Sequence, residues 1–436
     1  MEKQNIKYCL LLWLFSFYSC QNNKECFDLR ENAIFDSIPA KSIESLSNDV
    51  QQSLNYTEAL LGSWKLVKNK QYLERDPNCV SCTTPNSMSI SSFRQVLSFC
   101  GDNKNIISIT EETEDQGVEI AEDEIRKRIK FYSAEEYILK QFENHQIIMF
   151  NEAHDRVQTR AFFLSMLPAL KKAGATCLAM EALDQKGNLK TLDGTTGYYT
   201  CEPVMGQIIR EALRLNFKLI AYEDVDMGIH SSNQIDSIQA KNIFQNIATE
   251  TGIEKTVVLA GYGHISEVGF DLSTKFMAMW FKQMTKIDPL TVSQTDFIEA
   301  SYLNMIMTGP VKIIDKTDIK IFDSGLLSHS DIPFYDLYVC HPYTLYIHNR
   351  PSWLVTSKDM KFVSIEIPDS IKPVLIQAYL SEEIKSDEDY SLKIPCDQTF
   401  ESEYGKAWLV LNDKLKYNVV FRDQYNNIIH KIVKGF

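Results

Sequence analysis

An alternation of short apolar runs with helical patterns constrains the fold of this chain more than any other feature. Four apolar runs share this context: residues 147–150, 176–180, 217–222 and 256–260. Such runs are typical of strands that are buried on both faces. The segments between them carry apolar residues at helical spacing. The repeated strand–helix order over residues 132–300 predicts an α/β fold, with a mainly parallel sheet and helices on both faces.

The C-terminal part of the chain, residues 301–436, has a different pattern. Its strand-like runs are separated by turn-rich stretches and lie at residues 362–367, 374–380, 408–411 and 419–422. Strands without intervening helices predict a small β-rich domain, for which a sandwich is the simplest arrangement. We expect this domain to serve packing or interaction with a partner.

Residues 21–131 are expected to form a tether and a small N-terminal region. The polar start of this segment leads into a helical pattern at about residues 42–61. Residues 62–67 and 93–99 have the pattern of short strands, separated by a turn-rich loop. The prediction for this region is therefore one helix followed by two short strands.

Residues 1–20 have the features of an export signal. Lys3 and Lys7 give a positive start, and the apolar stretch 8–18 is too short to span a bilayer as a helix. The sequence Phe-Tyr-Ser-Cys at residues 17–20 resembles the cleavage box of bacterial lipoproteins. We therefore expect an exported, periplasmic or cell-surface protein anchored to the membrane by a lipid on Cys20. An ordinary secretory signal is the alternative.

Export to an oxidising compartment affects how the cysteines are interpreted. The net charge, in turn, limits the kinds of partner. Cys79 and Cys82 have the spacing of a zinc or redox motif, but no second pair of ligands lies close by. In an oxidising compartment we favour disulfides among Cys79, Cys82 and Cys100. Cys177 lies within an apolar run and is expected to be a buried thiol. The net charge of −13 argues against a nucleic-acid partner.

Polar side chains follow each of the four strands of the α/β region. They are Glu152 and His154, Glu181, Glu223 and His264. Because parallel strands place their carboxyl ends at one edge of the sheet, we expect these side chains to share one site there. A histidine can remove a proton from water while carboxylates orient it. Alternatively, His154, Glu181 and His264 match a catalytic divalent-metal site with three protein ligands.

The motifs at these strand ends resemble those of a known superfamily. Asn151-Glu152-Ala153-His154, Met180-Glu181-Ala182, Tyr222-Glu223 and Gly261-Tyr262-Gly263-His264 follow the order seen in erythromycin esterases, ChaN-like haem-uptake proteins and Tiki/TraB proteins. Asp236 and Asn242 match weaker polar positions of that superfamily. Asn151 replaces its usual Gly, and Asn also enters left-handed turns. Ile235 stands where an arginine is common, so a contact of that arginine with a substrate anion does not carry over.

The resemblance implies hydrolysis but does not choose the substrate. Our first hypothesis is an exported, lipid-anchored hydrolase that acts on an ester or a peptide bond of a small-molecule or peptide substrate. The second is a non-enzymatic lipoprotein that binds haem or another small ligand, with Tyr198, Tyr199, Tyr222 and Tyr262 as contacts. A third is an inactive family member whose C-terminal domain binds a partner. A serine-hydrolase elbow and a P-loop are both absent from the sequence.

Overall fold

The computed structural model describes residues 41–73, 87–114, 120–121, 130–226, 228–269, 271, 273–300, 305–306, 311–316, 328–329, 332–400 and 402–436. The predicted export signal with Cys20, and the Cys79–Cys82 pair, lie outside these residues. Among the helices of the described residues, none combines the length and the apolar character needed to cross a membrane.

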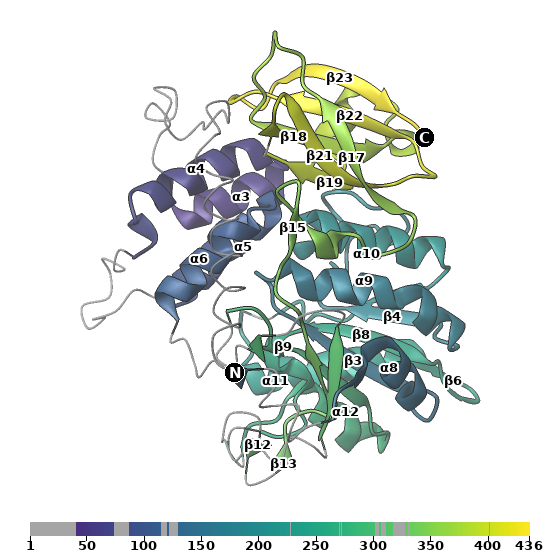
Figure 1. Ribbon diagram of the computed structural model, residues 1–436. Helices are drawn as coiled ribbons and strands as arrows, with labels where there is room; N and C mark the ends of the chain where they lie inside the picture. The colour runs from purple at the N-terminus through teal and green to yellow at the C-terminus, as the bar shows by residue number, and fades with distance from the viewer. Residues whose placement is uncertain are drawn as a thin grey trace, which may run out of the picture.

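The centre of the molecule is an eight-stranded sheet (Figure 1). Its strands, in spatial order, are β2 (Tyr132–Ser133), β11 (Lys312–Asp315), β14 (Leu337–Cys340), β9 (Leu290–Phe297), β3 (Ile147–Glu152), β8 (Thr256–Gly261), β4 (Cys177–Met180) and β5 (Lys218–Ala221). All neighbours from β14 to β5 are parallel, whereas β11 is antiparallel to both of its neighbours. The predicted α/β fold with a mainly parallel sheet is confirmed. We expected the α/β region to end near residue 300, but β11 and β14 extend the sheet to Cys340.

Helices cover both faces of the sheet, as predicted. They are α8 (Ala134–Phe142), α9 (Val157–Lys172), α10 (Pro203–Arg214), α11 (Ser232–Ile247) and α12 (Met277–Thr285). Alternate residues of β3 face opposite sides: Ile148 and Phe150 join the core formed with α9 and α10, and Ile147 and Met149 join the core formed with α11 and α12. Figure 1 shows these two helix layers on either side of the strands.

The strand order places a switch in chain direction at the centre of the sheet. The chain moves outward from β3 through β4 to β5, and then returns to β8, which lies between β3 and β4, and to β9 beyond β3. In such sheets ligands bind at the carboxyl ends of the strands, next to the point where the order reverses. Here that point is the end of β3 and β8, which carry the two predicted histidine motifs.

The predicted short strands of the N-terminal region are wrong, because both segments are helical. The helices of this region are α3 (Ile43–Ser53), α4 (Tyr56–Lys68), α5 (Ser87–Cys100), α6 (Asn103–Thr113) and the 3₁₀ turn η2 (Gln71–Leu73). In α5, buried Phe93, Val96, Leu97 and Cys100 follow the i, i+3, i+4, i+7 spacing of a helix face. The sequence pattern predicts strands here because both helices are largely buried, so their apolar residues form short continuous runs.

Two further expectations for the N-terminal region change. The helix expected at residues 42–61 is divided at Leu54, whose left-handed backbone (φ 48°) ends α3 before Asn55 caps α4. Cys100 is a buried free thiol, so it does not take part in the disulfides that we favoured. Cys177 is a buried free thiol, as expected.

The C-terminal region is β-rich, as predicted. One sheet contains β17 (Met360–Glu366), β21 (Lys406–Asn412) and β20 (Ser402–Glu403), and the other contains β19 (Asp397–Thr399), β18 (Leu375–Leu380), β22 (Tyr417–Arg422) and β23 (Ile428–Lys434). Both sheets are antiparallel, and Ile365 and Leu409 of the first share one core with Ile376 and Val419 of the second. This arrangement is a sandwich (Figure 1).

Short pairs and turns complete the described structure. The two-residue strand pairs are β1 (Ile120–Ala121) with β10 (Met305–Ile306), β6 (Ala248–Thr249) with β7 (Gly252–Ile253), β12 (Ser328–His329) with β13 (Ile332–Pro333), and β15 (Tyr346–Ile347) with β16 (Arg350–Pro351). The remaining 3₁₀ turns are η3 (Tyr199–Cys201), η4 (Tyr262–Ile265), η5 (Ser352–Leu354), η6 (Ser381–Glu383) and η7 (Asp387–Ser391). Of these, η3 and η4 border the site described next.

Candidate active site

The five predicted site residues lie at the carboxyl ends of four neighbouring strands. Glu152 ends β3, with His154 two residues later, and Glu181 directly follows β4. Glu223 follows β5, and His264 lies in η4 directly after β8. Glu181 interacts electrostatically with both histidines and with Glu223, which places these side chains in one group.

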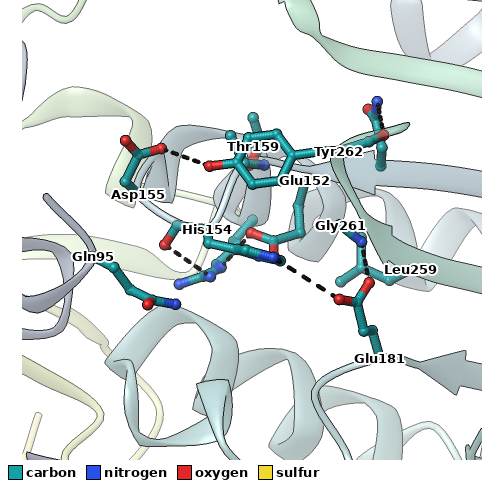
Figure 2. Close-up of polar contacts among 12 residues, drawn as sticks. Gln95, Glu152, His154, Asp155, Thr159, Glu181, Leu259, Gly261 and Tyr262 are labelled. Carbon is teal, nitrogen blue, oxygen red and sulfur yellow. Dashed lines mark hydrogen bonds and ion pairs between the residues drawn. The ribbon is translucent and has the colours of Figure 1, made fainter. Parts of the chain in front are cut away.

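The first histidine forms a pair with the carboxylate two residues before it. His154 Nδ1 is hydrogen-bonded to Glu152 Oε1, and the other carboxylate oxygen accepts from Arg160 Nε at 2.9 Å. Burial opposes ionisation of Glu152, but the positive charges of Arg160 and His154 outweigh it and lower the pKa of Glu152 to about 2. Burial likewise opposes protonation of His154, and the charge of Glu152 outweighs it and raises the pKa of His154. The Nε2 atom of His154 is left to face Glu181 (Figure 2).

Glu181 is held between the two strand-end motifs. Its Oε2 accepts a hydrogen bond from the backbone N–H of Gly261, and its Oε1 lies 3.9 Å from His154 Nε2. A Cβ atom at position 261 would lie 2.4 Å from His154 Cε1 and 2.8 Å from His154 Nε2. Glycine is therefore required here by the close approach of the imidazole to the backbone, not by backbone conformation (φ −79°).

The second histidine forms its own pair, with a carboxylate from a different element. His264 Nδ1 lies 2.7 Å from Oδ1 of Asp236 on α11, and the same oxygen accepts from the backbone N–H of Met277 at 3.0 Å. Burial opposes protonation of His264, but the Asp236 hydrogen bond and the charge of Glu181 outweigh it and raise the pKa of His264 to about 9. His264 is therefore mostly cationic at neutral pH.

Glu223 lies at the β5 end of the group. Burial, and then repulsion from Glu181, raise its pKa to about 7, although its Oε2 accepts from Gln239 Nε2 at 2.9 Å. Asn242, one turn further along α11, donates to the backbone carbonyl of Tyr222 at 3.0 Å. Both α11 side chains therefore support the end of β5.

The glycine-like place of Asn151 in the motif predicts a left-handed turn, but Asn151 does not adopt one. It is a buried residue of β3, and its amide donates to the carbonyl of Tyr262 at 2.9 Å. Its amide oxygen accepts from the backbone N–H of Gln294 at 2.6 Å. Asn151 thus joins the end of β3 to η4 and to β9.

Arg160 belongs to the candidate site, although the sequence pattern did not single it out. Its side chain is fully buried, and its three nitrogens bind Glu152 Oε2, Glu202 Oε2 at 3.4 Å and the carbonyl of His154 at 3.1 Å. Glu202 in turn caps α10 by accepting from the N–H groups of Val204 and Met205. An arginine within the apolar pattern of residues 157–170 was the available signal, because a buried arginine requires carboxylate partners.

The tyrosines singled out as ligand contacts divide into two groups. Tyr199 stacks on the His154 ring (centroids 4.3 Å apart, 21° between planes), and Tyr262 contacts it edge-on at 4.8 Å. Tyr198 packs edge-on against Tyr199 and is 49% exposed. Tyr222 is fully buried and donates to the carbonyl of Leu259, so it is a core residue.

The metal site predicted on His154, Glu181 and His264 stays a prediction. Among the described residues, no group of three or more His, Cys, Asp or Glu side chains is placed to hold a metal ion. The Nδ1 atoms of His154 and His264 are bound to carboxylates, which leaves Nε2 of each ring as the atom that would hold a metal, and Glu181 Oε2 is bound to Gly261. A haem iron would bind through His154 Nε2, the atom that faces Glu181, or through a tyrosine oxygen.

A large cavity lies elsewhere. About 1150 Å³ of space separates α9 and α10 from the C-terminal domain, and Leu164, Arg210 and Tyr417 are among its lining residues. None of the five predicted site residues lines it. The chemistry of the side chains, rather than the volume of a cavity, therefore identifies the candidate site at the sheet edge.

Comparison with known proteins does not show a family for this chain. No protein-family model matches it, and no curated protein matches it. Two similar solved structures are described as "Bacterial protein toxins" and "Crystal structure of bacterial protein toxins", each with 13% identity and a TM-score of 0.30. Each alignment covers 58% of this chain and 57% of the other, so this chain spans a little over half the length of these structures. Similarity at this level assigns neither fold nor function.

Proposed function

We propose that this protein is a hydrolase of ester or peptide bonds in which His154 and His264 act from two sides of Glu181. The observation that carries the proposal is the convergence of two histidine–carboxylate pairs on Glu181 at the carboxyl ends of β3, β4 and β8. Paired imidazoles with perturbed pKa values are typical of acid–base sites. Export and lipid anchoring at Cys20 remain predictions from the sequence.

His154 is the general base in this proposal. Glu152 binds Nδ1 and thereby fixes the ring and leaves Nε2 to accept a proton from water. Tyr199 and Tyr262 hold the imidazole plane by stacking and edge contacts. Because the pKa of His154 is raised, we expect the rate to increase with pH as this group loses its proton.

His264 and Glu181 stabilise the charge that develops during the reaction. The cationic His264 attracts the negative charge that develops on the substrate, and it can donate a proton to the leaving group. Glu181, fixed by the Gly261 N–H, keeps His264 protonated by its negative charge. The two imidazoles thereby take opposite roles, with one accepting a proton and the other carrying one.

The test compares three histidine variants on a panel of chromogenic esters and short peptides, with and without chelator. His154→Ala and His264→Ala should lose hydrolysis while keeping the circular dichroism spectrum of the parent protein. His145→Ala is the matched control, because His145 lies before the opposite end of β3 and the one described contact of its side chain is with the Gln141 carbonyl. Full activity in both site variants would overturn the proposal.

A second candidate function is the binding of a planar ligand such as haem. It is favoured by a row of aromatic rings, formed by Tyr198, Tyr199, His154 and Tyr262. Titration with haem distinguishes the two candidates. A Soret shift that Tyr199→Ala abolishes, in a protein without hydrolytic activity, would favour binding.

A further inference from the structure

Helix α5 reaches the sheet edge next to the proposed base. Arg94 Nε donates to Asp155 Oδ2 at 2.6 Å, and both side chains are buried. The Ser98 hydroxyl donates to the backbone carbonyl of His154 at 3.3 Å. These two contacts, one turn apart on α5, hold the N-terminal helices against the residue on which the proposed chemistry depends.

Gln95 lies between these two contacts, and its side chain extends from α5 towards His154 (Figure 2). Its Nε2 atom is buried and has no hydrogen-bond partner. Among the described contacts, the one group that the amide faces is the phenol of Tyr199, the ring that stacks on His154, and this interaction favours the ionised phenol. A buried donor without an acceptor destabilises a fold, so its position beside a candidate base calls for a functional explanation.

Arg160 also has N–H groups near His154, but they are not free to bind a substrate. Its three nitrogens are occupied by Glu152, Glu202 and the His154 carbonyl, and its side chain is fully buried. Gln95 Nε2 has no acceptor within hydrogen-bond distance among the described residues, and the group it faces is the uncharged phenol of Tyr199. An uncharged amide N–H in surroundings shielded from water is a strong partner for a developing negative charge.

We propose that Gln95 is a catalytic residue that donates its Nε2–H to the carbonyl oxygen of the substrate. The inference rests on the proposed function and narrows its substrates to carbonyl compounds, namely carboxylic esters or amides. It also assigns the N-terminal helices a direct part in the site, which the α/β region alone does not complete.

The reaction then balances as follows. His154 Nε2 removes a proton from water, the water oxygen bonds to the carbonyl carbon, and the electron pair of the C=O bond moves to oxygen. Gln95 Nε2–H stabilises this oxyanion without transferring its proton. The oxyanion re-forms the C=O bond, the bond to the alcohol or amine breaks, and the leaving group takes up a proton from the His264 imidazolium. The proton on His154 then passes to His264 through solvent, which restores both side chains. The products are a carboxylic acid and an alcohol or amine.

The experiment measures kcat, KM and the thermal midpoint of Gln95→Ala and Gln95→Glu on the best ester of the panel. We expect kcat to fall about 100-fold with little change in KM, as for the loss of one oxyanion donor. We also expect the midpoint of Gln95→Ala to stay level or rise, because the unpartnered donor is removed. Gln52→Ala is the matched control, because Gln52 is an exposed residue of α3 that binds only Asn48 among the contacts described.

The outcomes separate this inference from the function on which it rests. If His154→Ala is inactive while Gln95→Ala keeps the parent kcat, the role of Gln95 is wrong and the hydrolase proposal stands. A lower midpoint, with a rate loss explained by the unfolded fraction, would show a structural role and overturn the inference. If the parent protein hydrolyses no ester or peptide, or His154→Ala stays active, the hydrolase proposal falls and the role of Gln95 falls with it.

Discussion

Replacing Gly261 by alanine tests whether the position of the His154 imidazole controls activity. The backbone at Gly261 (φ −79°, ψ 144°) is allowed for alanine, so the substitution introduces no backbone strain. The new methyl group would lie 2.4 Å from His154 Cε1 and 3.1 Å from Glu181 Oε2. Carbon atoms normally approach to about 3.5–4.0 Å, so the methyl group and the ring overlap by at least ~1 Å.

The ring must yield, because Gly261 belongs to a central strand and His154 is a side chain. A shift of about 1 Å breaks the Nδ1 bond to Glu152 or moves Nε2 away from Glu181, and a misplacement of that size can cost about 100-fold in rate. The effect on stability is smaller. An overlap in a packed region costs about 1–3 kcal/mol, and Gly→Ala at a compatible site returns about 0.4–1 kcal/mol.

The assay compares kcat/KM with the unfolding free energy in urea. Gly263→Ala is the matched control, because it lies in the same turn and its Cβ would meet Phe276 at 3.6 Å, an ordinary contact. We expect Gly261→Ala to lose about 100-fold in kcat/KM, as the ~1 Å displacement implies, and Gly263→Ala to stay near the parent value. Parent-like activity in Gly261→Ala would refute the reasoning that ties activity to the His154 position.

Three further predictions follow from the charged groups. Because the pKa of His264 is raised to about 9, activity should fall as the pH rises through that value, and Asp236→Asn should move this limb of the pH–rate profile to lower pH. The pKa of Glu152 is lowered from 4.5 to about 2, so its contribution to stability is full above pH 4.5 and lost as the pH falls towards 2. Between those pH values, the unfolding free energy of Glu152→Gln, measured in urea, should depend less steeply on pH than that of the parent protein. Arg160→Met should cost about 3–5 kcal/mol in urea unfolding, because it leaves the carboxylate of Glu202 buried without a cation and Glu152 with His154 alone; a loss below 1 kcal/mol would contradict this.

Local hydrophobic periodicity predicted the strands of the α/β region correctly but predicted strands in place of helices in the N-terminal region. The strand β3 is buried along its whole length between two helix layers, so its sequence is a continuous apolar run. Helix α4 is also buried on most sides, from Tyr56 to Leu66, and it produces a similar run at residues 62–67. Two different structures thus give one local pattern when burial removes the polar face.

The sequence by itself determined the strand–helix order and, through the shared direction of parallel strands, the placement of Glu152, His154, Glu181, Glu223 and His264 at one edge. Those are consequences of local pattern and chain direction. The tertiary structure alone decided which groups bind one another.

Contacts between distant segments hold the site together. Asp236 binds His264, Arg160 binds Glu202, Gly261 binds Glu181, and α5 is fixed to Asp155 by Arg94 across 61 residues of sequence. A single sequence records the residue types at these positions but not their distances, because packing of helices and strands sets those distances. The two strand-end histidines were therefore predictable, whereas the partners that set their charge and orientation were not.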